Sequence, residues 1–595
     1  MSYPIETMRH SAAHVMAAAI QKLFPDVKFG VGPAIEHGFY YDIDIGRAVT
    51  PEDLKAIEKG MWHIVNQDAE FVREEMSLDE AVSLFEKLNQ PYKVELLKDL
   101  KEKGTTRFGA EEAGDVDPAN TERATVYRTG TFTDLCRGPH VSHAKEVGAW
   151  KIMKSAGAYW RGNQENPQMQ RIYGVCFATQ EELAAHLVML EEAKKRDHKV
   201  LGPALDLFTF SDLVGPGLPL WTPRGTILRD TLDAYVWELR HAKGYERVEI
   251  PHITKKELYE TSGHWAKFKD ELFRIVTREG HEFAMKPMNC PHHTQIYARR
   301  QWSYRELPQR YANTTMCYRD EQTGELSGLS RARSFTQDDA HVFCRMSQVK
   351  EEFLKIWDVI HTFYGTFGFS LTVRVSLHDP AHPDKYLGDP ARWQDAEGVL
   401  REIVKGQGTE AFEAVGEAAF YGPKLDFMAK DSLGREWQVA TIQLDMNMPE
   451  RFDLSCINEQ GEAERIVMIH AAIMGSIERF LSIAIEHYAG AFPLWLAPEQ
   501  VRLLPVADRH VEFGEALATE LREKGLRVEV DASAESIPKK VRNAEHLKIP
   551  VMLVVGDKEA GGEALAVRRY GIKDQTTQSK DELVAGLLEE IRSRK

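Results

Sequence analysis

The sequence predicts a multidomain protein that combines α+β and α/β parts, and three observations lead to this prediction. The chain has 595 residues, enough for about three or four domains of ordinary size. Its first segment mixes helical and strand-like patterns. Its tail alternates apolar strands with amphipathic helices, which is typical of a small α/β domain with a largely parallel sheet.

The first domain is expected over residues 1–178 and a connector over residues 179–200. Met8–Phe24 is rich in alanine and ends before a proline, which predicts a helix, and Phe29–Asp44 predicts strand and turn. Thr179–His198 is strongly charged but carries leucines on one stripe. This pattern predicts a helix that links two domains.

The central domain is expected over residues 201–492 and the last domain over residues 493–595. In the last domain, helices separate or follow three strands. The strands are predicted at Val501–Ala507, Arg527–Val530 and Val551–Gly556, and the helices at Val511–Lys524, Pro538–Leu547 and Asp581–Arg592.

The composition is ordinary for a soluble globular protein, with 43% hydrophobic and 28% charged residues. The chain has no long apolar run and no signal-peptide pattern, so we expect a cytoplasmic protein with no membrane partner. Six scattered cysteines without a CxxC pair argue against a disulfide framework. The net charge of -16 does not exclude nucleic-acid binding, because basic residues can gather on one face.

The segment Met316–Cys344 carries the most informative pattern. Tyr318–Glu321 precedes a polar loop with glycines, and Arg331 and a dense polar run follow it. A strand, a hairpin loop and a returning strand would place these groups on one sheet face, with Glu321 two residues after Arg319. Because arginine forks suit phosphate oxygens, the pattern predicts a nucleotide and an amino acid bound side by side. A surface salt-bridge hairpin is the alternative.

A second segment, Ile469–Phe480, places Arg479 in an otherwise apolar stretch that we expect to be helical. A buried arginine requires an anionic partner. Together the two segments resemble motifs 2 and 3 of the class II aminoacyl-tRNA synthetases. Gly244–Pro251 resembles motif 1, the dimer-interface element of that class.

A narrower similarity, to the threonyl-tRNA synthetase family, rests on three further segments. They are Met285–Pro291, Phe335–His341 and Val467–His470. The resemblance extends from the first residues of the chain to the last. Most bacterial members begin with a small ubiquitin-like domain, whereas this chain is expected to start directly at the next domain.

The resemblance implies a class II antiparallel-sheet catalytic core over residues 201–492. It implies an N-terminal α+β editing domain over residues 1–178 and a C-terminal α/β anticodon-binding domain over residues 493–595. The implied activity is that of a threonine–tRNA ligase, which forms threonyl-adenylate from L-threonine and ATP with Mg²⁺, transfers threonine to tRNA(Thr), and hydrolyses mischarged seryl-tRNA(Thr). The implied assembly is a homodimer through the face that carries Pro251.

Cys290, His341 and His470 are far apart in the sequence, and no spacing rule joins them. Each of them alone is more often a core residue than a ligand. The resemblance implies that they bind one zinc ion per subunit and leave one position open for threonine. A thiolate and two neutral imidazoles suit this metal.

The resemblance also implies roles for residues around that zinc. Arg319 is expected to hold the α-phosphate of ATP, and Glu321 is expected to face adenine. Arg331 and Arg479 are expected to bind the outer phosphates. His264 is expected to help deprotonate a hydroxyl of the tRNA, and an ordinary exposed loop histidine is the alternative. The residues expected to bind threonine are Gln337, Asp339, Tyr421, Lys424 and Gln443.

Two pairs of candidate ligands lie in the first domain. His10 and His14 are four apart on a predicted helix, and Cys136 and His140 are four apart downstream. They could form a tetrahedral zinc site or be two unrelated structural pairs. The resemblance implies a third interpretation, in which these four residues and Asp134 line an editing pocket that positions a water and requires no metal.

The chain departs from the family beside the implied sites. The departures are His292, Ala471, Phe268, Ala418 and Met448 near the zinc ligands, and Ala534 where an anticodon-reading asparagine is expected. Glu559 and Arg568 match anticodon-binding residues. Because the zinc ligands and phosphate arginines are kept, one hypothesis is a specialised copy that charges threonine but tolerates an inhibitor of the pocket. A plain lineage variant is the alternative.

Two rival functions remain open. One is a catalytically silent, synthetase-like RNA-binding or regulatory protein, against which the intact Arg319 and Arg479 argue. The other is an enzyme specific for another amino acid, such as a prolyl or seryl relative, against which the three implied zinc ligands argue.

Overall fold

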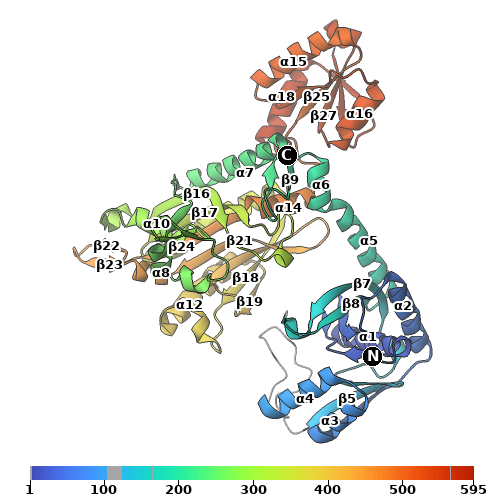
Figure 1. Ribbon diagram of the computed structural model, residues 1–595. Helices are drawn as coiled ribbons and strands as arrows, with labels where there is room; N and C mark the ends of the chain where they lie inside the picture. The colour runs from blue at the N-terminus through green and yellow to red at the C-terminus, as the bar shows by residue number, and fades with distance from the viewer. Residues whose placement is uncertain (1–2, 104–122, 164, 563) are drawn as a thin grey trace. The chain divides into compact units, whose positions relative to one another are not determined.

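The chain divides into two units, Met1–Glu191 and Glu192–Lys595, in the computed structural model, which describes residues 3–103, 123–163, 165–562 and 564–595. Helix α5 (Gln180–Arg196) contains the division and confirms the helix predicted at Thr179–His198 (Figure 1). The prediction of a multidomain protein with α+β and α/β parts is confirmed.

The first unit has two antiparallel sheets around the alanine-rich helix α1 (Ile5–Leu23), which confirms the helix predicted at Met8–Phe24. A Cβ added at Gly60 of helix α2 (Pro51–Asn66) would lie 3.1 Å from that of Ala19, so small residues let α1 and α2 pack closely. The larger sheet comprises β1 (Lys28–Phe29), β3 (Gly38–Asp44), β8 (Gln168–Phe177) and β7 (Ala149–Tyr159), with β2 (Ala34–Ile35) paired to β3. The smaller sheet comprises β4 (Phe71–Ser77), β5 (Arg123–Thr129) and β6 (Phe132–Leu135), and the other helices are α2 (Pro51–Asn66), α3 (Leu78–Lys87) and α4 (Pro91–Lys103).

An eight-stranded sheet forms the centre of the second unit. Its six central strands pair antiparallel, and the two edge pairs, β11 with β16 and β18 with β19, are parallel. In order across the sheet, the strands are β11 (Glu246–Arg247), β16 (Gln309–Tyr318), β17 (Ser334–Cys344), β24 (Val467–Ser476), β21 (Glu436–Asp445), β20 (Lys424–Lys430), β18 (Ser370–Leu377) and β19 (Ala411–Val415). The expected antiparallel core is therefore correct for the strands that carry the candidate site.

Helices cover one face of this sheet and close the main hydrophobic core. They are α7 (Pro223–Ala242), α11 (Val349–Thr366) and α14 (Ile477–His487). The remaining elements before the last domain are α6 (His198–Ala204), β9 (Phe208–Thr209), β10 (Leu220–Trp221), β12 (Ile253–Lys255), α8 (Lys256–Ser262), α9 (His264–Lys267), β13 (Arg274–Val276), β14 (Glu282–Met285), α10 (Cys290–Tyr297), β15 (Trp302–Ser303), α12 (Pro390–Gln407), α13 (Asn447–Arg451), β22 (Ser455–Ile457) and β23 (Ala463–Arg465).

The end of the chain forms the α/β domain that the alternating pattern predicts. Strands β26 (Val528–Val530), β25 (Val501–Pro505) and β27 (Val551–Val555) are parallel, and β28 (Leu565–Arg569) and β29 (Thr576–Gln578) continue the sheet antiparallel. Its helices are α15 (Val511–Glu523), α16 (Ile537–His546), α17 (Asp557–Ala560) and α18 (Lys580–Arg592). All three predicted strands and all three predicted helices are present.

Two local expectations in the second unit are wrong. Residues Ile469–Ser476 belong to strand β24, and only the residues from Ile477 onward are helical. Arg319 and Glu321 follow the end of β16 and therefore do not share a strand face. An apolar run that is buried on both sides has no periodicity to separate a strand from a helix, which explains the first error.

A buried ion pair joins α7 to the central strands. Nη2 of Arg240 lies 3.4 Å from Oδ2 of Asp338, and both side chains are almost completely buried. Asp338 also accepts hydrogen bonds from the backbone N–H groups of Ile473 at 2.9 Å and Met474 at 3.0 Å. Burial raises the pKa of Asp338 to about 6, so the carboxylate is still ionised at neutral pH.

Replacing Asp338 is expected to destabilise the second unit strongly. Asp338→Ala should lower the free energy of unfolding by about 3–5 kcal/mol, because it leaves the Arg240 guanidinium buried without its carboxylate. Asp358→Ala removes an exposed partner of Lys243 and serves as the control, with an expected loss of about 1 kcal/mol or less. Urea unfolding followed by tryptophan fluorescence measures both losses, and equal losses would contradict the prediction.

Candidate functional site

Three neighbouring strands and one helix bring the predicted zinc ligands together. His341 of β17 lies directly opposite His470 of β24, and Gln443 of β21 lies opposite His470 on the other side. Cys290 is the first residue of α10, and Pro291 after it suits the first turn of a helix. The donor atoms of Cys290, His341 and His470 lie within 4.8 Å of one another.

Each histidine of this cluster turns one nitrogen inward and holds the other in a hydrogen bond. Nε2 of His341 and Nδ1 of His470 face each other at 3.1 Å. Nδ1 of His341 lies 2.8 Å from Nδ1 of His293, and Nε2 of His470 lies 2.9 Å from Oδ2 of Asp445. Outer partners of this kind fix the tautomer and orientation of histidines that bind a metal. The donor set therefore fits a zinc ion.

The electrostatics of the cluster also favour a cation. Burial lowers the pKa of His341 well below its usual value, so its imidazole is neutral, which is the form that binds metal. Burial raises the pKa of the Cys290 thiol, and the nearby Asp339 and Asp445 raise it further. A positive charge at the cluster would favour the thiolate there.

His264 lies beside the cluster and is fully buried, so the alternative of an exposed loop histidine is wrong. Its Nε2 is 3.6 Å from Sγ of Cys290, and its Nδ1 is 2.8 Å from Oγ of Ser262. Burial lowers the pKa of His264 to about 3, which keeps the ring neutral at physiological pH. A ring kept neutral in this way can accept a hydrogen bond from a hydroxyl placed next to it, but it is a weak proton acceptor.

Three of the five residues expected to bind threonine surround the cluster. The ring of Tyr421 stacks on that of His470, with 4.8 Å between centroids, and its hydroxyl donates to Oε1 of Gln443. Oδ1 of Asp339 lies 3.7 Å from Nε2 of His341. Polar groups of a small substrate could therefore meet acceptors and donors on several sides of the cluster.

The other two expected threonine ligands lie slightly apart. Lys424 is opposite Gln443 in the sheet, but its Nζ pairs with the buried Asp426 at 2.9 Å. Gln337 lines the adjoining cleft instead of the cluster itself.

That cleft has a volume of about 500 Å³ and contains all four residues expected to bind the nucleotide, which are Arg319, Glu321, Arg331 and Arg479. Ala472 also lines it and lies opposite Asp339, so the cleft adjoins the cluster. Arg479 is in the first turn of α14 and is exposed toward the cleft, so the expectation that it is buried is wrong.

The arginines of the cleft differ in how many of their donor groups already have a partner within the protein. The guanidinium of Arg319 lies over the rings of Phe335 and Phe268, at 5.2 and 5.4 Å, and its Nε is buried without a hydrogen-bond partner among the described residues. Arg331 pairs with Glu321 at 2.7 Å. A buried donor without a partner is costly, which favours an anionic ligand at Arg319.

A second cluster forms in the first unit from the two predicted pairs. Helix α1 supplies His10 and His14, and the segment after β6 supplies Cys136 and His140. Sγ of Cys136 lies 3.3 Å from Nε2 of both His10 and His140. Burial lowers the pKa of His10 to about 4 and lowers those of His14 and His140 further below their usual value. Three neutral imidazoles therefore surround one sulfur.

Asp134 lies beside this second cluster, next to His14, and is held by two residues, Lys93 and Tyr41, that the sequence did not indicate as part of the site. Its Oδ2 lies 3.5 Å from Nε2 of His14, and its Oδ1 pairs with Lys93 at 2.7 Å. Tyr41 donates its hydroxyl hydrogen bond to the same carboxylate. Lys93 is almost fully buried, which no local sequence signal predicts, because its partners come from other parts of the chain.

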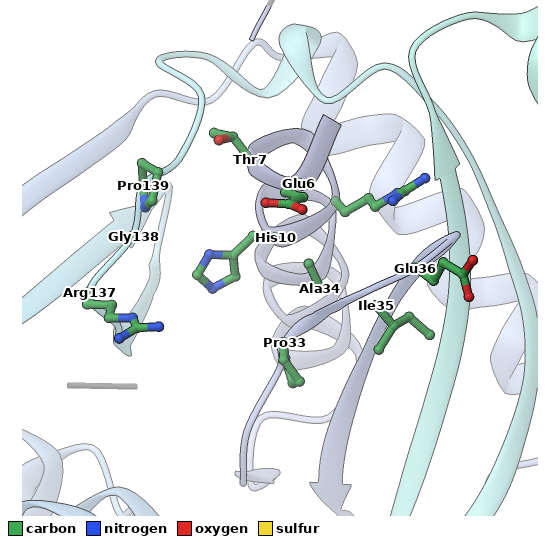
Figure 2. A pocket seen from close by; sticks show the side chains of 11 residues that line it. Glu6, Thr7, His10, Pro33, Ala34, Ile35, Glu36, Arg137, Gly138 and Pro139 are labelled. Atoms are coloured by element: carbon green, nitrogen blue, oxygen red, sulfur yellow. The ribbon is translucent and has the colours of Figure 1, made fainter. Parts of the chain in front are cut away.

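A pocket of about 430 Å³ opens next to His10. Figure 2 shows His10 facing this space from α1, between the segment Arg137–Pro139 and the segment Pro33–Glu36. Arg9 and Arg137 also line it. Glu6 and Glu36 line it as well, so the pocket presents charges of both signs and leads to the histidine.

The predicted anticodon residues lie on separate elements of the last domain. Glu559 lies in α17 and accepts a hydrogen bond from the backbone N–H of Gly556 at 2.9 Å. Arg568 lies in β28, and its buried Nε has no hydrogen-bond partner among the described residues. Ala534 lies between β26 and α16. Their role in reading an anticodon stays a prediction.

Three family models match parts of the chain. The tRNA synthetase class II core domain (G, H, P, S and T) matches residues 271–488, and the anticodon binding domain matches residues 500–590. The threonyl and alanyl tRNA synthetase second additional domain matches residues 124–173.

Known relatives match nearly the whole chain. The chain is 48% identical to the threonine–tRNA ligase of Gloeobacter violaceus over 601 residues, which cover 99% of this chain and 93% of the relative. It is 48% identical to the threonine–tRNA ligase of Deinococcus radiodurans over 598 residues, covering 98% and 89% of the two chains. A crystal structure of the RNA binding domain of threonyl-tRNA synthetase from Cryptosporidium parvum matches with a TM-score of 0.64 and 36% identity, over 66% of this chain and 98% of that chain.

The two clusters lead to a prediction about metal content. The purified protein should hold one zinc per chain, and Cys290→Ala should lose it because the thiolate ligand is gone. Cys456→Ala removes a buried cysteine outside the cluster and should keep the zinc. Elemental analysis by mass spectrometry measures the ratio. Zinc retained in Cys290→Ala, or two zinc ions per wild-type chain, would contradict the assignment.

Proposed function

The chain belongs to the threonine–tRNA ligase family of class II aminoacyl-tRNA synthetases, and we propose that it charges tRNA(Thr) at the site described above. The single observation that carries the proposal is the position of the Cys290, His341 and His470 cluster beside the cleft of Arg319 and Arg479. In the first step L-threonine and ATP form threonyl-adenylate. In the second step threonine passes to a terminal hydroxyl of the tRNA.

The nucleotide binds in the 500 Å³ cleft, with Mg²⁺ as its accompanying cation. Arg319 holds the α-phosphate and stabilises the charge that develops there, and its buried, unpartnered Nε supports this role. Glu321 faces adenine, and Arg331 and Arg479 bind the outer phosphates. Catalysis is then mostly a matter of positioning and of electrostatic stabilisation.

Threonine binds at the cluster. Cys290, His341 and His470 would hold a zinc ion, which when bound would act as a Lewis acid toward the amino group and the hydroxyl of threonine. Tyr421, Gln443 and Asp339 orient the amino acid from the surrounding strands, with Lys424 and Gln337 at the edges of the site. Valine lacks the hydroxyl, so polar groups of the site would stay unpaired and valine is rejected. His264 helps to deprotonate the attacking tRNA hydroxyl in this proposal by accepting a hydrogen bond from it.

The chain has an editing domain, and we propose that this domain hydrolyses seryl-tRNA(Thr). Serine keeps the hydroxyl of threonine and lacks one methyl group, a difference worth only about 1–3 kcal/mol in a pocket. A second site is therefore needed to remove it. His10, His14, Cys136 and His140 position the attacking water, and Asp134 orients this group without a metal.

The same reasoning extends to the organisation of the chain. We propose an editing domain at 1–178, a connector at 179–200, a catalytic domain at 201–492 and an anticodon-binding domain at 493–595. All three matched segments lie inside these bounds. Glu559 and Arg568 contact the anticodon of tRNA(Thr) in this proposal.

We also propose a homodimer through the edge near β11, where Pro251 and Ile253 are exposed. The place of action is proposed to be the cytoplasm. Among the described residues, no helix combines the length and the apolar character needed to cross a bilayer.

The hypothesis of an inhibitor-tolerant copy gains no support from the structure or from the relatives. Of the departing residues, His292, Met448 and Ala471 are buried, and Phe268 packs on His264. These contacts explain where the changes lie but do not connect them to an inhibitor. The hypothesis is therefore not part of the proposed function.

The activation step can be tested by ATP–pyrophosphate exchange. The wild-type protein should show exchange with L-threonine and far less with valine or proline. Arg319→Ala should reduce the rate by about 10²–10³, because one preorganised contact to the developing charge is lost. Arg278→Ala alters an exposed turn and should match the wild type. Absence of threonine-dependent exchange would favour a catalytically silent protein, and a preference for another amino acid would favour a different specificity.

The editing step can be tested separately from activation. His14→Ala should abolish hydrolysis of seryl-tRNA(Thr) and leave threonine-dependent exchange unchanged, because His14 lies in the first unit and the ATP cleft lies in the second. His63→Ala changes an exposed histidine of α2 and serves as the control. Deacylation of preformed seryl-tRNA measures the effect. If His14→Ala also stopped exchange, the assignment of two separate sites would be wrong.

A further inference from the structure

A buried histidine at the start of α6 contacts the loop that lines the ATP cleft. His198 is the first residue of α6, separated from α5 by Asp197 alone, and is almost completely buried. Its Nδ1 lies 2.7 Å from Oε1 of Glu486, near the end of α14. Its Nε2 lies 3.1 Å from the backbone nitrogen of Leu329, in the loop between β16 and β17.

These two contacts define which ring nitrogen of His198 carries the proton. The backbone N–H of Leu329 can only donate, so Nε2 of His198 must accept. Nδ1 then carries the proton and donates it to Glu486. His198 is therefore a neutral imidazole that links a carboxylate to a backbone amide.

The same groups do not form a metal site, although Asp197, His198 and Glu486 lie close enough together for one. Nε2 of His198 is occupied by the amide of Leu329. The second oxygen of Glu486 pairs with Arg435 at 2.6 Å. The potential metal-ligating atoms of His198 and Glu486 therefore already have partners within the protein.

The loop rests directly on the histidine ring. Gly328 has a φ of +54°, and a Cβ added to it would lie 2.4 Å from Nε2 of His198. The next residues, Leu329, Ser330 and Arg331, line the cleft. The position of this wall of the cleft therefore depends on the ring below it.

We propose that His198 is a positioning residue for ATP. It holds the amide of Leu329 and so fixes the place of Arg331 in the cleft. Through Glu486 it connects this loop to α14, the helix that carries Arg479 at its other end. Both arginines assigned to the outer phosphates are thereby fixed relative to one carboxylate. This inference rests on the proposed function, because it takes the cleft to be the ATP site.

Two substitutions can separate the effects of the two hydrogen bonds made by the His198 ring. The amide of His198→Asn can replace Nδ1 and donate to Glu486, but it is too short to reach Leu329. The longer side chain of His198→Gln can place its oxygen where Nε2 was and accept from Leu329. The loop contact is therefore lost in the first variant and kept in the second.

The expected result is a change in ATP affinity that follows the loop contact. His198→Asn should weaken equilibrium binding of ATP and raise its KM about ten-fold, which is the size of one lost hydrogen bond. The KM for threonine and the rate at saturating ATP should change little. His198→Gln should restore ATP affinity to within about two- or three-fold of the wild type.

A matched control is present in the same unit. His198 also donates its backbone N–H to Oε1 of Glu486 at 3.1 Å. His378 makes the same two contacts to Glu397, with Nδ1 at 2.7 Å and its backbone nitrogen at 2.9 Å from Oε1, but no contact to the loop of Leu329 is among them. His378→Asn should leave ATP binding unchanged. Calorimetric titration with ATP gives the affinities, and thermal unfolding shows whether each variant is folded.

The inference is overturned if His198→Asn binds ATP as the wild type does. It is also overturned if both His198 variants lose affinity for ATP and threonine equally, since that result indicates a general loss of structure. A failure of the proposed function looks different. In that case the wild-type protein would show no threonine-dependent exchange. The ATP affinities of the His198 variants could still be compared with that of the wild type, so the role of His198 would be tested independently.

Discussion

The candidate synthetic site depends on the pairing register of β17, β24 and β21. Side chains alternate between the two faces of a strand, so Gln337, Asp339 and His341 share one face and Asp338 lies on the other. In this register His341 lies opposite His470. If the pairing of β17 shifted by one residue, His341 would point into the core and Asp338 would point to the face that carries the cluster. The cluster of Cys290, His341 and His470 and the residues proposed to bind threonine therefore require the same alignment.

A bulge in β24 allows this register and the cleft of Arg319 and Arg479 to occur in the same sheet. Between the pairs that join Asp339 to Ala472 and Gln337 to Ser476, β24 has extra residues, and their backbone N–H groups need partners. Asp338 accepts from two of them, at Ile473 and Met474, and Arg240 balances its charge. The chain then leaves the sheet, so that α14 begins at the cleft. One buried carboxylate therefore stabilises both the register and the exit of the strand.

The sequence predicted the parts of the structure that depend on local patterns, and it missed those that depend on distant partners. The alanine-rich α1, the charged α5 and the alternating last domain have periodic or capping signals, and each was correct. The run before Arg479 has no such signal, because it is buried on both faces, and it was wrongly expected to be helical. Only resemblance joined the three zinc ligands, and neither pattern nor resemblance pointed to Lys93 or His198, whose partners lie far away in the sequence.

The two cysteine–histidine clusters have similar donor sets, but their surroundings support different chemistry. Sγ of Cys136 is within 3.3 Å of two imidazole nitrogens and of the backbone N–H of Gly138, so the protein itself can stabilise a charged or polarised sulfur. The carboxylate of Asp134 is balanced by Lys93. Cys290 instead lies among acidic groups that raise the pKa of its thiol. A cation bound at Cys290 would stabilise its thiolate among these acidic groups, whereas the carboxylate of the first cluster is already paired with Lys93, which agrees with the proposal that its neutral imidazoles orient a water.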